Sequence, residues 1–118
     1  MNASTSKGPG LSIRIDLPNG GRFGPGKAAL LDAISELGSL NKAAAHLGMS
    51  YPRAKKLVEE MNDHFQRPLV VSSQGGAAGG GSQLTETGHK VQTLYRELCN
   101  RSLSQNCDLL KQAGRLSA

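Results

Sequence analysis

The stretch LNKAAAHLGMSYPRAKKLVE, residues 40 to 59, has the spacing of two short helices joined by a tight turn. Two helices that cross steeply over such a turn need small residues at their contact, a turn residue that tolerates a left-handed backbone, and an apolar residue directly after it. Ala44, Gly48 and Met49 occupy these positions. The other buried positions of the seam fall on Ala43, Leu47, Ala54 and Leu57. The stretch therefore predicts a helix-turn-helix.

An amphipathic helix is expected before this stretch. Its apolar residues have helical spacing and are Leu30, Leu31, Ile34 and Leu37. Gly38 follows its last turn as a C-cap, and Ser39 and Ser50 stand where the next two helices need N-caps. Pro52 lies in the first turn of the third helix, where its ring breaks no intrahelical hydrogen bond. The sequence thus predicts three short helices in succession.

A first pair of strands is expected before the helices. LSIRIDL, residues 11 to 17, alternates apolar and polar side chains, which is typical of a half-buried strand. Asn19-Gly20 is a strong turn signal, and the next two residues, Arg22 and Phe23, return as a short partner strand.

A second hairpin, here called the wing, is expected after the helices. PLVVSS, residues 68 to 73, indicates its first strand. A glycine-rich loop at 74 to 83 follows, and Leu84 begins the return.

A last, long helix is expected after the wing. Thr85 is its N-cap, and its apolar positions are Val91, Leu94, Tyr95 and Leu98. Residues 102 to 106 offer a break in this helix, and Gly114 sets its outer limit.

The predicted fold class is mainly α with a small β-hairpin wing, an α+β fold. More specifically, the order of elements predicts a winged helix-turn-helix with a long C-terminal helix. We expect a flexible N-terminal arm at 1–10, a winged helix-turn-helix DNA-binding domain at 11–100, and a C-terminal helical extension or tail at 101–118 that contributes to dimerisation.

Composition and charge narrow the class of partner that the protein is expected to bind. The formal net charge is +5 and the isoelectric point is near 9.6, which favours an anionic partner such as nucleic acid. Two tyrosines and two phenylalanines are too few for a stacking platform, which argues against single strands and RNA. The sequence shows neither a membrane span nor a signal peptide, so we expect a cytoplasmic protein with free thiols at Cys99 and Cys107.

The stretch GRFGPGK, residues 21 to 27, imitates the start of a phosphate-binding loop. Ala28 follows where a hydroxyl for Mg²⁺ is needed, and Pro25 removes a backbone donor, so the nucleotide-hydrolase reading fails. Neither a catalytic grouping nor metal-ligand spacing stands out, so we expect no enzyme activity, no metal and no cofactor. Lys27 keeps one open role, as a phosphate contact.

The third helix offers candidate DNA contacts on the face opposite its apolar residues. They are Ser50, Tyr51, Pro52, Arg53, Lys55 and Lys56. Arg53 suits bidentate recognition of guanine, and Lys55 and Lys56 suit phosphates. The alternative is a solvated face on which Glu59 and Glu60 pair with these lysines.

Two further sets of DNA contacts are expected outside the third helix. The opening of the second helix supplies Ser39, Asn41 and Lys42, where the helix dipole suits a phosphate. The wing tip supplies backbone contacts at Gln74, Gly75 and Gly76.

The sequence also resembles a known family. GPGKAALLDAISELGSLNKAAAHLGMSY at 24 to 51, Asn62, Phe65, PLV at 68 to 70 and LTETG at 84 to 88 resemble the DNA-binding domain of molybdate-dependent transcriptional regulators (ModE-type), relatives of the LysR-type regulators. The resemblance covers about residues 11 to 100. It implies a bacterial DNA-binding domain that dimerises chiefly through its last helix, with Ser50 to Lys56 as base reader and the wing at Leu69 to Leu84.

Two departures limit what the resemblance implies. Family members often have tryptophan where this sequence has Lys55, so the operator is expected to differ. Full-length members also have C-terminal oxyanion-binding modules, for which the residues after the wing leave no room. Molybdate binding by this chain is therefore doubtful.

The leading interpretation is sequence-specific binding of duplex DNA by a bacterial transcriptional regulator. It is expected to act as a homodimer on a pseudo-palindromic operator, with a link to molybdate regulation implied by the resemblance. Two alternatives stay open: a winged-helix protein-interaction module, and an oxyanion-responsive protein without its own sensor domain.

Overall fold

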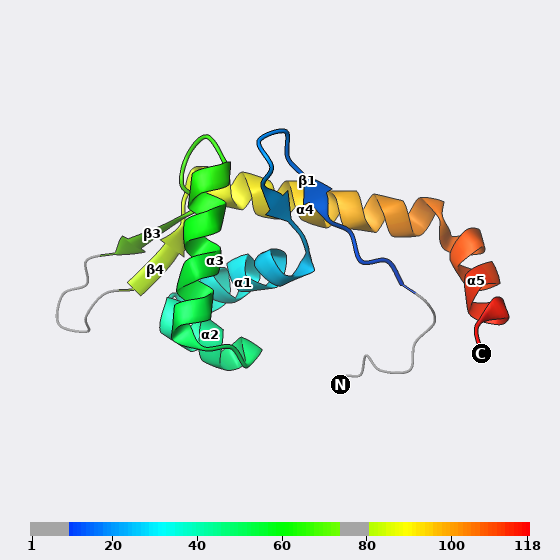
Figure 1. The fold of residues 1–118 in the computed structure, drawn as a ribbon, viewed down its shortest axis with the longest axis horizontal. Helices are drawn as coiled ribbons and strands as arrows, with labels where there is room; N and C mark the ends of the chain where they lie inside the picture. The colour runs from blue at the N-terminus through cyan, green and yellow to red at the C-terminus, as the bar shows by residue number, and fades with distance from the viewer. Residues whose placement is uncertain (1–9, 74–80) are drawn as a thin grey trace.

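The computed structural model describes residues 10–73 and 81–118 and has the predicted winged helix-turn-helix architecture (Figure 1). Its elements follow in the order β1 (Ile15–Asp16), β2 (Arg22–Phe23), α1 (Pro25–Leu37), α2 (Leu40–Leu47), α3 (Tyr51–His64), β3 (Val70–Ser73), β4 (Gly81–Leu84), α4 (Glu86–Gln105) and α5 (Cys107–Leu116). The strands form two antiparallel hairpins, β1-β2 and β3-β4. Most of the arm expected at 1–10 lies outside the described residues.

The hydrophobic core lies where α1, α3, α4 and the two hairpins meet. The largest side chains that are fully buried are Phe23, Leu30, Leu31, Ile34, Met61 and Leu69. The Phe23 ring contacts the Tyr95 ring edge to face, with centroids 5.2 Å apart, and so joins β2 to α4. Leu37, expected in the apolar stripe, is 40 % exposed at the last residue of α1.

The helix ends follow the predicted capping residues. Gly38 and Gly48 adopt left-handed conformations, with φ of 69° and 71°, and end α1 and α2. Ser39 Oγ accepts a hydrogen bond from the Lys42 backbone N–H at 3.1 Å, and Ser50 Oγ accepts one from the Arg53 N–H at 3.2 Å. The helices of the helix-turn-helix therefore begin and end at the capping residues that the sequence predicted.

The first strand is shorter than the alternation predicted. Ile13, Ile15 and Leu17 are half-buried as expected, yet only Ile15 and Asp16 pair with a partner strand. The physical reason is the length of the partner, because α1 begins at Pro25 directly after β2 and leaves the residues before Ile15 no strand to bond to.

Two predicted boundaries near the wing and the C-terminus are wrong. The return strand begins at Gly81 and ends at Leu84, because pairing with β3 holds the small residues Gly81 and Ser82 extended. Gly114 does not end the last helix, since α5 continues to Leu116 and tolerates a glycine at a modest cost. The break expected at 102 to 106 is confirmed at Asn106.

The base of the wing is held by hydrogen bonds to α3, to the N-cap of α4 and to the C-cap of α1. From α3, Asn62 Oδ1 accepts the Leu69 and Val70 N–H groups at 2.8 and 3.2 Å, and its Nδ2 donates to the Val70 carbonyl at 3.1 Å. From the start of α4, the Thr85 N–H donates to the Leu69 carbonyl at 2.9 Å. From β4, the Ser82 N–H donates to the Gly38 carbonyl at the end of α1, at 3.0 Å.

The first turn of α4 lies directly against this base. A Cβ added at Gly88 would stand 2.2 Å from the Leu69 carbonyl oxygen, a backbone atom that is already hydrogen-bonded. Only glycine permits this approach. The residue that sequence alone reads as a weak helix former is therefore required by packing.

Gly88→Ala is expected to lower the free energy of unfolding by about 3 kcal/mol or more, because α4 must move off the wing. Gly26→Ala is the matched control: Gly26 also lies in the first turn of a helix, and its Cβ would meet nothing within 4 Å. Chemical denaturation measures both variants. Equal stability of the two variants would contradict the inferred clash between a Cβ at residue 88 and the Leu69 carbonyl.

Tyr95 connects α4 to the N-terminal segment, because its hydroxyl donates to the Ile13 carbonyl at 2.6 Å. Burial raises the pKa of Tyr95 from 10.0 to about 12, and the neighbouring Cys99 thiol adds to this increase. The neutral phenol thus stabilises the fold fully below pH 10, and this contribution is lost as the pH rises toward 12.

The stability difference between the natural chain and Tyr95→Phe should therefore shrink between pH 10 and 12. Tyr51→Phe serves as the control, because Tyr51 is 46 % exposed on α3. Urea denaturation across this pH range measures both differences. A stability difference for Tyr95→Phe that stays constant between pH 10 and 12 would refute the raised pKa of Tyr95.

Candidate nucleic-acid interface

The N-terminal half of α3 is presented to solvent on one face. Ala54, Val58 and Met61 are buried and fix the orientation of the helix. The residues predicted to contact DNA on α3 and at its cap are all exposed: Ser50, Tyr51, Pro52, Arg53, Lys55 and Lys56. The seam of the helix-turn-helix also forms as predicted, with Ala43, Ala44 and Ala54 buried and Leu47, Met49 and Leu57 packed against them.

The first turn of α2 adds a second exposed region. Asn41 and Lys42 are exposed there, and Ser39 is half-buried at the cap. The oxygens of Ser39 and Ser50 accept backbone hydrogen bonds, and this leaves each hydroxyl proton able to donate to a phosphate.

The positive charges divide into two groups. Four ion pairs occur among residues 10–73 and 81–118, and they use Arg14, Lys27, Arg96 and Arg101. In the same part of the chain Lys42, Arg53, Lys55 and Lys56 have no ion-pair partner within 4 Å. The cations of the helix-turn-helix therefore remain available to an anion.

Glu60 does not pair with Lys56 one turn away, as the alternative interpretation supposed. It pairs with Lys27 of α1 at 3.2 Å. Lys27 Nζ also donates to the Arg22 carbonyl at 2.8 Å, and only 12 % of its side chain is exposed. Lys27 thus connects α1, α3 and β2, which leaves it poorly placed for the phosphate contact considered from sequence. No local pattern could have found a partner so distant in the chain.

The wing lies beside α3, with β3 and β4 extending away from the core (Figure 1). The predicted contacts Gln74, Gly75 and Gly76 lie outside the described residues and stay predictions. The strands that flank them are held at their base by Asn62 and Thr85, so the direction of the wing relative to α3 is fixed.

Residues 27–89 match the family model described as bacterial regulatory helix-turn-helix protein, lysR family. The chain is 38% identical over 86 residues to the molybdenum transport protein ModE of Azotobacter vinelandii, covering 73% of this chain and 32% of that protein. It is 42% identical over 76 residues to the molybdenum-pterin-binding protein MopB of Rhodobacter capsulatus, covering 64% and 28%. It is 37% identical over 71 residues to the DNA-binding transcriptional dual regulator ModE of Escherichia coli K12, covering 60% and 27%.

These matches confirm the resemblance recognised in the sequence. The chain spans about a third or less of the length of the curated relatives it matches.

Lys27→Met is expected to destabilise the fold by about 1 kcal/mol, because it removes a charge-assisted contact between three elements. Lys42→Met, which removes an exposed and unpaired lysine, should change stability by less than about 0.5 kcal/mol. A double-mutant cycle of Lys27→Met with Glu60→Gln isolates the pair by denaturant unfolding. A coupling energy of zero would show that the pair contributes nothing.

Proposed function

The chain belongs to the lysR family of bacterial regulatory helix-turn-helix proteins, and we propose that it binds duplex DNA sequence-specifically within a transcriptional regulator. The observation that supports this most directly is the exposed N-terminal half of α3, whose cations Arg53, Lys55 and Lys56 have no ion-pair partner in the described part of the chain. A helix of this kind fits the major groove, where base edges are distinguishable.

In this proposal each exposed group has its own role. Arg53 donates two hydrogen bonds to a guanine, and Lys55 and Lys56 neutralise phosphates or reach neighbouring bases. Lys42 and the backbone N–H groups at the start of α2 bind a phosphate of the adjacent backbone. The wing tip, at Gln74, Gly75 and Gly76, approaches the minor groove.

We further propose that two copies bind together through α4. Leu94 and Leu98 lie on one side of this helix and are 58 % and 38 % exposed, and α4 extends well beyond the core (Figure 1). Contact between two such helices would place both copies of α3 on one side of the duplex. Two half-sites about 34 Å apart, or a multiple of that, would then form a pseudo-palindromic operator.

The proposal includes a link to molybdenum metabolism at the level of gene control. Relatives that share this region are named for molybdenum transport and molybdenum-pterin binding. The matched region is the helix-turn-helix, which supports DNA binding as the contribution of these residues. We propose a cytoplasmic location and no catalytic step. None of the helices among residues 10–73 and 81–118 is long and apolar enough to cross a membrane.

Arg53→Ala should cost about 1–3 kcal/mol of binding free energy at the preferred site and relax the preference at one base pair. Selection of bound sites from randomised duplexes, followed by titration, measures both effects. Lys56→Ala should instead weaken binding to all sequences alike and reduce the slope of log K against log salt by about 1.

Lys90→Ala provides the matched control, because Lys90 is also an exposed lysine but belongs to α4, outside the helix-turn-helix. An unchanged site preference in Arg53→Ala would refute its role as a base reader. Binding of the natural chain that is independent of salt would refute the whole proposal and favour a protein-interaction module.

A further inference from the structure

The solvent-facing side of α3 changes the sign of its charge halfway along the helix. Pro52, Lys56, Glu59 and Asp63 have the spacing of one helical stripe, here called the outer stripe, and all four are exposed. The lysines and the arginine of α3 all lie in its N-terminal half, while the two carboxylates of the stripe lie in its C-terminal half. The outer stripe is therefore basic at one end and acidic at the other.

The two carboxylates of the outer stripe are not neutralised by the fold. Among residues 10–73 and 81–118, Glu59 and Asp63 have no ion-pair partner within 4 Å. Arg67, in the loop after the helix, does not pair with Asp63 at that distance either. Lys55 precedes Glu59 by one turn, but lysine before glutamate is the less favourable order for a pair on a helix.

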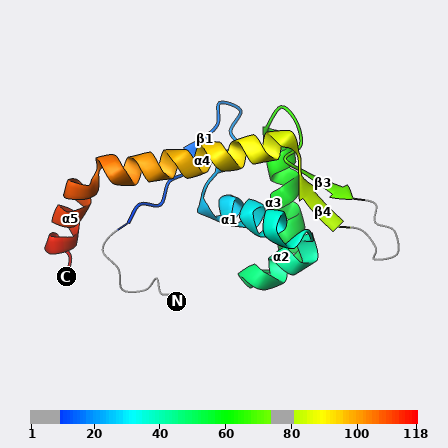
Figure 2. The same cartoon turned by 180° about the vertical axis from the view of Figure 1, so that it is seen from behind.

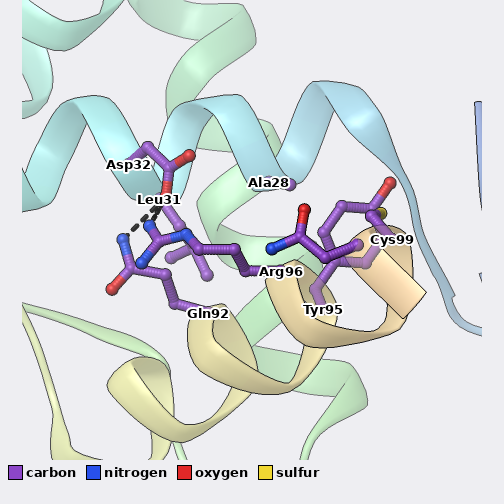
Figure 3. Close-up of a pocket in the computed structure, with 8 residues that line it drawn as sticks. Ala28, Leu31, Asp32, Gln92, Tyr95, Arg96 and Cys99 are labelled. Carbon is purple, nitrogen blue, oxygen red and sulfur yellow. Dashed lines mark hydrogen bonds and ion pairs between the residues drawn. The ribbon is translucent and has the colours of Figure 1, made fainter. Parts of the chain in front are cut away.

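Carboxylates on other faces of the molecule show the contrast. Glu60, the next residue of α3, pairs with Lys27 of α1 at 3.2 Å. Asp32 of α1 accepts a hydrogen bond from Gln92 Nε2 at 2.7 Å and pairs with Arg96 of α4 at 3.3 Å (Figure 3). Each of these carboxylates meets a cation from a second element, unlike the two on the outer stripe.

The order of charges in α3 also runs against the helix dipole. The N-terminus of a helix favours negative charge and the C-terminus favours positive charge. Arg53 nevertheless lies in the first turn of α3, and Asp63 lies beside His64 in its last turn. This arrangement weakens the helix slightly, so local stability does not account for it. An anion that approaches only the N-terminal end of α3 does account for it.

The length of α3 separates its two ends in a DNA groove. Its N-terminal end lies beside α2, and its C-terminal end lies toward the start of α4 (Figures 1 and 2). At a rise of 1.5 Å per residue, Glu59 lies about 12 Å along the axis from Tyr51, and Asp63 about 18 Å. The major groove is only about 8.5 Å deep. A helix that enters by its N-terminus therefore keeps both carboxylates away from the groove floor.

We propose that Glu59 and Asp63 determine the specificity of DNA binding by repelling phosphates whenever α3 lies along the DNA backbone. This inference rests on the proposed DNA binding and specifies how α3 approaches the duplex. Non-specific binding depends on contacts with the backbone, so it brings the whole outer stripe close to phosphates. Like charges then oppose that mode more strongly than insertion of the N-terminal end.

The full chain with Glu59→Gln and Asp63→Asn tests the proposal. Its affinity for a duplex of unrelated sequence should rise several-fold, and its affinity for the site selected by the natural chain should rise less. The ratio of the two affinities should thus fall. Titration of both duplexes at one salt concentration measures this ratio. Glu59→Lys should also steepen the slope of log K against log salt on the unrelated duplex by about 1.

Glu36→Gln is the matched control, because Glu36 is an exposed carboxylate of α1 without an ion-pair partner in the described part of the chain. Unchanged affinity of the double variant for both duplexes would overturn the proposal, and so would an equal rise for both. Loss of preference at a single base pair would also overturn it, because Glu59 would then accept a hydrogen bond from a cytosine amino group.

Stability separates this role from a structural one. Both substitutions remove negative charge from the C-terminal half of α3, so the midpoint of urea unfolding should stay the same or rise slightly. A lower midpoint would show that the carboxylates stabilise the fold and would overturn the proposal. Salt-independent binding by the natural chain would instead refute the proposed function, whereas normal binding with a double variant that matches Glu36→Gln refutes only this inference.

Discussion

The contact between Leu69 and the first turn of α4 is the constraint on which the rest of the structure depends. The Leu69 N–H donates to Asn62 of α3, while its carbonyl accepts the Thr85 N–H and lies where a Cβ on residue 88 would stand. One fully buried residue therefore joins the third helix, the wing and the long helix. Because the angle between α3 and α4 is set here, so is the direction in which a dimer built on α4 would present α3 to DNA.

The distribution of charge follows from the same packing. Lys27 is taken up by Glu60 and the Arg22 carbonyl, because α1, α3 and β2 converge there. Farther along α3, toward its N-terminus, there is no neighbouring element to supply a carboxylate, so Arg53, Lys55 and Lys56 remain unpaired in the described part of the chain. Four of the unpaired cations, Lys42, Arg53, Lys55 and Lys56, therefore lie on the helix-turn-helix. Packing, more than composition, makes this surface suitable for an anion.

The long helix α4 and the helix that follows it leave apolar side chains exposed. Its N-terminal half completes the core through Val91 and Tyr95, but its C-terminal half and α5 extend past every other element (Figure 2). The radius of gyration is 16.4 Å, compared with about 13.5 Å for a compact domain of this length. Leucines on that extension remain exposed, which is consistent with the proposed contact of two copies through α4.

The sequence by itself determined the helices, their caps and the seam of the helix-turn-helix. Those features depend on local chemistry: Gly48 tolerates a left-handed backbone, Ser50 caps a helix, and alanines permit close approach whatever the rest of the chain does. The exposed residues of α3 could be predicted for the same reason, since they follow from the helical period once the apolar face is known. Which of them touch DNA stays a prediction.

Only the tertiary structure decided what depends on a distant partner. The first strand begins only at Ile15, because its partner ends at Phe23 just before α1, and the return strand of the wing begins at Gly81 because β3 pairs with it. Lys27 is a candidate phosphate contact from the sequence, but Glu60 lies beside it, and Gly88 cannot be replaced by a larger residue because the Leu69 carbonyl lies against it. Strand length, charge pairing and close approach are properties of two segments at once, so neither segment alone contains them.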